Sequence, residues 1–148
     1  MTIAQTSTTS FKVELFQAVH NFGPTSPDTF KIALYTAAAN IGPTTTAYTA
    51  TNEVVGTGYT AGGNTLVIST SPTSGNNGAN IPTAFVSFSN TSWASSTITA
   101  RGALIYNSTP GNKSVAVLDF GADKTTANTT FLITFPSADA SSAIVRIS

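Results

Sequence analysis

Short runs of alternating apolar residues, separated by turn-forming residues, recur along most of the chain. In FKIALY, residues 30–35, the side chains of Phe30, Ile32 and Leu34 would share one face of an extended strand. The other runs of this kind are NTLVIST, TAFVSFS, STITARGALIYN, SVAVLDFG, TTFLITFP and AIVRIS. About seven or eight short strands joined by Gly, Pro, Ser and Asn predict an all-β fold of the β-sandwich or jelly-roll type.

The connections between these runs are predicted from their turn residues. NSTPGNK at 107–113 predicts a compact hairpin connection, and GADKTTAN at 121–128 predicts a turn between the next two strands. SPTSGNNGAN at 71–80 predicts a flexible loop, and residues 36–51 predict a loop that carries at most a short helix. The four glycines of EVVGTGYTAGG, residues 53–63, predict tight backbone bends.

One helix is predicted near the N-terminus. Apolar residues recur at helical spacing from Phe11 to Phe22, with Ser10 as the N-cap and Gly23 and Pro24 as the stop. A strand through Phe11, Val13 and Leu15 is the alternative. Residues 1–10 are polar and without periodicity, so we expect them to form an extended N-terminal arm. Residues 11–148 are expected to form a single β-sandwich domain that includes the one short helix.

The composition is that of a packed protein with few charges. Only 8% of the residues are charged, against about a quarter in an average soluble protein, and six basic and six acidic residues cancel. A surface with so few charges is expected to be covered by neighbouring molecules. Roughly three residues in ten are Ser or Thr, yet 41% are hydrophobic, which argues against disorder.

Several cellular contexts are disfavoured by what the sequence lacks. There is no cysteine, so disulfides and thiolate sites are excluded. The N-terminal MTIAQTSTTS has no basic and apolar secretion signal, and no apolar run approaches the roughly 20 residues that span a bilayer. The expectation is synthesis in the cytoplasm, with no membrane partner.

The residue types that carry catalysis are sparse. His20 is the only histidine and no GxSxG elbow is present, so we interpret it as a structural or interface residue near the helix end. Asp119-Phe120-Gly121 matches a kinase triplet without the other kinase motifs, and Asp119 and Asp123 lack further oxygen ligands for a metal. The glycines of 53–63 continue into a strand, which favours a bent connection over a phosphate cradle. We therefore predict no catalytic, cofactor-binding or metal-binding residue and a non-enzymatic protein.

The sequence has few features that favour binding to nucleic acid or sugars. The dispersed basic residues and zero net charge disfavour nucleic acid. Four N-x-S/T triplets, at Asn90, Asn107, Asn112 and Asn128, are expected by chance in a chain so rich in Ser and Thr. Trp93 and Tyr48, if exposed, would suit contact with sugars, whereas a sugar hydrolase would need two facing carboxylates among Glu14, Glu53 and four Asp residues.

The segments FKIALYT, GTGYTAGG and VLDFGADK are the most distinctive parts of the chain, and SFKVELFQAVHNF precedes them. With the stretches around them, from Ser10 to Ile147, they resemble a recurring small virion protein of tailed bacteriophages. The resemblance implies a capsid decoration (cement) protein that bridges capsomers on the virion surface, with the phage major capsid protein and copies of itself as partners. A homotrimer is favoured by analogy and a dimer comes second. The alternative is a tail or fibre component that contacts the host surface through carbohydrate. The resemblance carries no catalytic residues.

Overall fold

The computed structural model describes residues 2–148 and contains two antiparallel sheets and one α-helix. The prediction of an all-β domain with one short N-terminal helix is confirmed. The five-stranded sheet has the order β1 (Thr6–Ser7), β7 (Lys113–Ile133), β6 (Thr91–Asn107), β2 (Phe30–Tyr35) and β3 (Asn64–Thr65). The three-stranded sheet has the order β4 (Ile68–Asn76), β5 (Pro82–Phe88) and β8 (Val145–Ile147).

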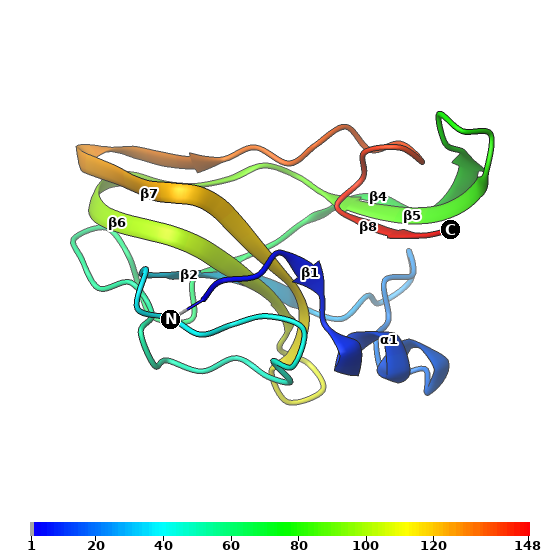
Figure 1. Ribbon diagram of the computed structural model, residues 1–148, viewed down its shortest axis with the longest axis horizontal. Helices are drawn as coiled ribbons and strands as arrows, with labels where there is room; N and C mark the ends of the chain where they lie inside the picture. Colours follow the sequence, from blue (N-terminus) through cyan, green and yellow to red (C-terminus); the bar gives the residue numbers. More distant parts are fainter. Residues whose placement is uncertain (1) are drawn as a thin grey trace.

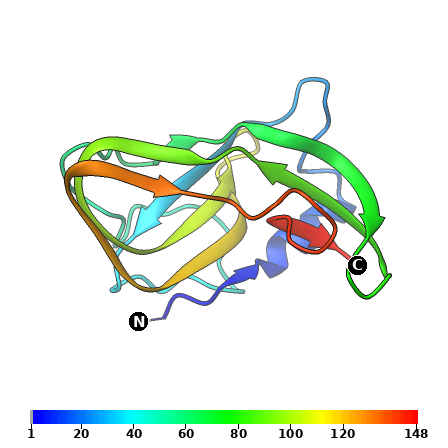
Figure 2. The ribbon, with the colours of Figure 1, turned by 90° about the horizontal axis from the view of Figure 1, so that it is seen from above.

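A long ribbon of β6 and β7 builds most of the sandwich-like arrangement. Its pairing runs from Asn107 opposite Lys113, at the predicted hairpin, to Thr91 opposite Ile133. Both strands bend together at the end of the molecule opposite α1 and β8 (Figures 1 and 2). Beyond the bend, the second half of the ribbon lies over its first half. The ribbon therefore contributes to both layers, and the core lies between its two halves.

The prediction of a turn at 121–128 is wrong, because β7 is continuous through this segment. The register shifts between Ala100 and Gly102, where residues 120–123 bulge opposite Arg101. Gly121 adopts a φ of 74°, which glycine does without steric cost. A bulge of this kind bends a strand without ending its pairing. The predicted loop at 71–80 is also mostly strand, because β4 continues to Asn76.

Aromatic rings from strands and connections pack in the core together with aliphatic side chains. Phe22 stacks on Phe30 with ring centroids 4.2 Å apart, and Phe88 lies 5.7 Å from Phe30. On the other face of β2, Ala33 and Tyr35 pack in a second cluster with Leu104 and other residues. Burial of each large apolar side chain contributes roughly 1.5–3 kcal/mol. Strand β2, correctly predicted at 30–35, is thus buried on both faces.

Helix α1 spans Thr9–Phe16 and is shorter than predicted. Its N-cap is Thr8, whose Oγ1 accepts a hydrogen bond from the Phe11 amide, so the assignment of Ser10 as N-cap is wrong. Thr8 is held in place by its Oγ1, which lies 2.9 Å from Ser114 Oγ on β7. The alternative of a strand through Phe11–Leu15 is excluded by the same helix.

The helix ends before Val19 and Phe22 because the chain turns left-handed at Ala18, whose φ is 56°. The Ala18 amide donates to the Leu15 carbonyl and the Val19 amide donates to the Glu14 carbonyl, at 3.2 and 3.0 Å. These two bonds form a Schellman motif with alanine in the position that glycine usually takes. The reversal brings the residues after the helix back against it.

The N-terminal segment is extended and packs on the chain's own sheet. Thr6 and Ser7 pair with Val117 and Ala116 of β7, and Ile3 bridges to Ile41. The segment at 36–51 is a loop of bends and contains no helix. No helix in residues 2–148 is long and apolar enough to cross a bilayer.

The glycine-rich segment makes the predicted tight bends. Gly58, Gly62 and Gly63 have positive φ angles of 80°, 87° and 67°. A Cβ atom on Gly63 would lie 1.8 Å from the carbonyl oxygen of Ile32, so no other residue fits there without moving the backbone. The segment therefore packs directly on strand β2.

Candidate functional site

His20, the only histidine, lies in a buried polar cluster beside helix α1. Its Nε2 is 2.8 Å from Glu14 Oε2, and its side chain is fully shielded from solvent. Lys113 Nζ lies 2.8 Å from the other Glu14 oxygen. Burial raises the pKa of Glu14, but the hydrogen bonds from Lys113 and His20 outweigh this and hold the pKa below its ordinary value of 4.5.

The second ring nitrogen of His20 fixes its tautomer. Asn107 Nδ2 lies 3.1 Å from His20 Nδ1 and also donates to Asp28 Oδ2 at 2.7 Å. An amide nitrogen can only donate, so Nδ1 accepts and Nε2 carries the proton that goes to Glu14. Both nitrogens are thus occupied by groups that hold the loop after α1. Asn107, which also begins one of the N-x-S/T triplets, is completely buried.

A second buried cluster surrounds Glu53 in the glycine-rich segment. Its carboxylate accepts hydrogen bonds from the hydroxyls of Tyr48 and Tyr59, at 2.6 and 2.7 Å, and from the Gly62 amide at 2.7 Å. No ion pair to Glu53 is present in the described chain. Burial raises the pKa of all four tyrosines, and the Glu53 charge adds to this; the pKa of Tyr106 rises to about 12.

The two buried carboxylates are separate structural centres rather than a facing pair at a cleft. Glu14 binds His20 and Lys113, while Glu53 ties the glycine-rich segment to itself. Asp119 accepts from the Gly121 amide at 2.9 Å and lies 3.5 Å from Arg101, which places it in the β7 bulge. No group of three or more metal-ligating side chains is found in residues 2–148.

Trp93 does not meet the condition for sugar contact, which is an exposed ring. Trp93 is only 4% exposed and packs between Tyr59 and Phe131, with ring centroids 5.7 and 6.0 Å away. Tyr48 is half-buried, and its ring stacks on Tyr106 at 4.8 Å. The Trp93 ring is thus closed to a sugar and the Tyr48 ring is covered on the side of Tyr106, which weakens the case for carbohydrate contact.

Helix α1 presents apolar side chains on the side that faces solvent. Phe16 is 94% exposed and Val13 is 51% exposed, whereas the charged Glu14 of the same helix is buried. A helix on the surface of a protein normally keeps its large apolar side chains inward, as Phe11 does here, but Phe16 and Val13 point outward instead. The outer face of α1 is therefore suited to contact with another molecule.

A groove runs between α1 and the edge strand β8, which lie at the same end of the molecule (Figure 1). It has a volume of about 450 Å³, and we call it the α1–β8 groove. Its main lining residues are Phe11, Lys12, Leu15, Phe16, Arg146 and Ile147. An adjoining apolar hollow of about 250 Å³ shares Phe11, Leu15 and Ile147 and reaches inward to Phe22 and Val145. The groove and the hollow are thus neighbouring cavities with mostly apolar linings.

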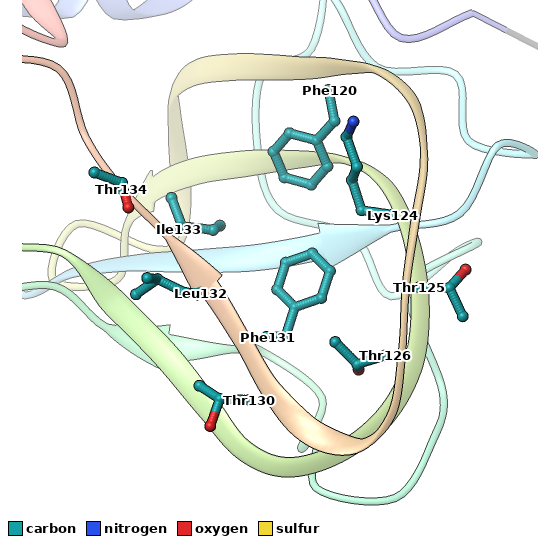
Figure 3. A pocket seen from close by; sticks show the side chains of 9 residues that line it. All are labelled: Phe120, Lys124, Thr125, Thr126, Thr130, Phe131, Leu132, Ile133 and Thr134. Atoms are coloured by element: carbon teal, nitrogen blue, oxygen red, sulfur yellow. The ribbon is translucent and has the colours of Figure 1, made fainter.

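A second open hollow, of about 440 Å³, lies within the bend of β7. Figure 3 shows the strand curving around the rings of Phe120 and Phe131, with threonine side chains and Lys124 at its margin. The two rings are 6.2 Å apart. The polar groups here are threonine hydroxyls and one lysine ammonium, with no carboxylate or histidine beside them. The lining could therefore contact a ligand but has no pair of groups for acid–base catalysis.

The sequence predictions did not identify the α1–β8 groove. A signal was available, because Phe11, Val13, Leu15 and Phe16 surround most of a helical cylinder instead of one stripe. The contribution of Ile147 and Arg146 depends on β8 joining β5, which lies far away in sequence. That pairing could not be inferred from periodicity.

The chain was compared with known proteins at three levels. No family model, no curated protein and no solved structure matches it. The functional interpretation therefore depends on the residues and surfaces described above.

Proposed function

We propose that this chain is a non-enzymatic structural protein of a tailed-phage particle, and specifically a capsid decoration protein that stabilises the shell by bridging capsomers. The observation that carries the proposal is the exposure of Phe16 and Val13 on the outer face of α1, on a helix whose inner side is already occupied by Phe11 and Glu14. Such a helix is explained if its outer face is covered in an assembly. The resemblance to phage virion proteins indicates which assembly.

The energetics of a repeating contact suit this role. Covering a large apolar side chain stabilises a complex by roughly 1.5–3 kcal/mol, and each copy on a shell repeats the gain. With 8% charged residues, the protein has little charge repulsion to overcome when its copies approach one another. A homotrimer about a local symmetry axis would present several such contacts at once, and a dimer would present fewer.

Binding of the purified protein to shells tests the proposal. Isolated capsids that lack the protein should bind it at a copy number comparable to that of the capsomers, and bound shells should resist heat better than bare ones. Phe16→Ser should weaken binding at least tenfold, whereas Gln17→Ser, a change at the exposed neighbouring position, should not.

Two results would count against the capsid role. Shells that bind no protein, or particles that lack it in electron micrographs, would exclude cementing. A few copies per particle, located on the tail, would instead favour the tail or fibre alternative.

A further inference from the structure

We infer that the α1–β8 groove binds an extended segment of another protein, which adds to the three-stranded sheet beside β8 and carries acidic residues between apolar ones. The inference depends on the proposed function only for the identity of that partner, a protein of the shell. The chemistry of the bound segment follows from the groove itself.

The first argument is the open edge of the sheet. Strand β8 is the last in the order β4-β5-β8, and its pairs are Val145 with Val86 and Ile147 with Ala84. No strand of the described chain lies on its outer side, so part of its backbone has no partner within the sheet. Backbone groups at such an edge are a template for an added strand.

The second argument is the apolar floor beside this edge. Ile147 is 58% exposed and faces the groove together with Leu15 and Phe16 of α1. Below it, the inner hollow continues to Phe22 and Val145. Alternate side chains of an added strand point to one face, about 7 Å apart, so every second residue would enter the groove. Those residues should be apolar.

The third argument is charge. Lys12 and Arg146 are the only charged side chains that line the α1–β8 groove, and neither forms an ion pair within residues 2–148. Arg146 adjoins Ile147 in β8 and therefore projects from the opposite face of the strand, where the residues between the apolar ones of the bound segment would also project. Carboxylates there would complement Arg146 directly, and Lys12 adds to the positive field around the segment. A second copy paired symmetrically through β8 would instead bring the two Arg146 side chains, and the Lys12 side chains nearby, toward one another. The groove therefore fits an acidic segment of another protein better than it fits the β8 strand of a second copy.

The test selects ligands for the full chain from a random library of peptides roughly ten residues long, the length of a long strand. Enriched peptides should alternate apolar residues with Asp or Glu. For a synthetic enriched peptide, fluorescence anisotropy should show binding at least tenfold weaker to the Lys12→Glu, Arg146→Glu double variant and to Phe16→Ser. Lys124→Glu, a basic residue of the β7 hollow, is the matched control and should bind like the unmodified protein.

Strand addition has its own readout. N-methylation of the peptide at alternate residues removes backbone donors, and only one of the two alternations should abolish binding. Failure of any peptide to enrich, enrichment of basic peptides, equal binding to the double variant, or tolerance of both alternations would overturn the inference. So would a self-associated protein that Phe16→Ser converts to monomers, because a second copy would then occupy the groove.

The two proposals fail separately. Peptide binding without shell binding would remove the capsid role and leave the groove assignment in place. Shell binding that the Lys12→Glu, Arg146→Glu variant retains in full would leave the capsid role in place and show that the shell does not bind in the α1–β8 groove.

Discussion

The hydroxyl of Tyr59 donates a hydrogen bond to Glu53 Oε1 at 2.7 Å and accepts one from the Leu34 amide of β2 at 2.8 Å. A buried carboxylate is thereby connected through one side chain to strand β2 of the larger sheet. Because the same carboxylate also holds the Gly62 amide, it fixes both ends of the glycine-rich segment. Glu53 therefore has a structural role, because its carboxylate accepts hydrogen bonds from Tyr59, which contacts β2, and from the Gly62 amide.

Glu53→Gln should lower the free energy of unfolding by about 2 kcal/mol. An amide is a weaker acceptor than a carboxylate, and its NH₂ group would meet donors from Tyr48, Tyr59 and Gly62. Chemical denaturation measures the change. Asp123→Asn, at an exposed carboxylate, should change stability by less than about 0.5 kcal/mol. Equal losses of stability in the two variants would show that the hydrogen bonds to the Glu53 carboxylate do not stabilise the fold.

The four tyrosines should ionise only when the protein unfolds. Burial, with the Glu53 charge, raises the pKa of each of them above the ordinary value of 10. The folded state then keeps protons that the unfolded state releases, so this stability is complete below pH 10 and is lost as the pH rises toward about 12. Absorbance of tyrosinate and circular dichroism should change together in an alkaline titration. Tyrosinate absorbance at pH 10 in a folded protein would contradict this.

Acid should destabilise the protein through Glu14. Its pKa is lowered in the folded state, so its contribution is present above the unfolded value of 4.5 and is lost as the pH falls below that. Denaturation midpoints measured at neutral pH and in acid should converge between wild type and Glu14→Gln, because the variant has no carboxylate to protonate. A difference between the two midpoints that stays the same from neutral pH to acid would show that protonation of Glu14 does not affect stability.

Much of the fold could be predicted from local pattern, and the exceptions have physical causes. FKIALY was identified as a strand because β2 is regular, and the hairpin at 107–113 because its turn residues stand between two clear strands. The helix end was missed because Ala18 is left-handed, a conformation that the sequence signals only with glycine or asparagine. The continuity of β7 was missed because Gly121 makes a bulge in place of a turn.

Ala18→Gly should raise the free energy of unfolding by about 0.5–1 kcal/mol, because glycine adopts the left-handed conformation without the cost that the alanine Cβ imposes. Thermal and chemical denaturation would measure this gain. Ala94→Gly, at an exposed position in β6 that has no positive φ, should lose a similar amount. Destabilisation by both changes would mean that the helix end is not strained at Ala18.

The candidate site was less predictable than the fold. Absence of catalytic motifs and scarcity of charge point to surfaces, but the sequence does not show which aromatic rings are exposed, and Trp93 fills the core. The α1–β8 groove combines residues 11–16 with residues 146–147, and only the tertiary pairing of β8 brings them together. Local periodicity contains no information on that contact.

Footprinting of intact particles with hydroxyl radicals would show whether the outer face of α1 is covered. Phe16, 94% exposed in the single chain, should be oxidised readily in the free protein and at least tenfold less in the particle, while the buried Phe30 should stay unmodified in both. Equal oxidation of Phe16 in the two samples, or particles from which the protein is absent by mass spectrometry, would contradict the assignment of this chain to an assembled shell.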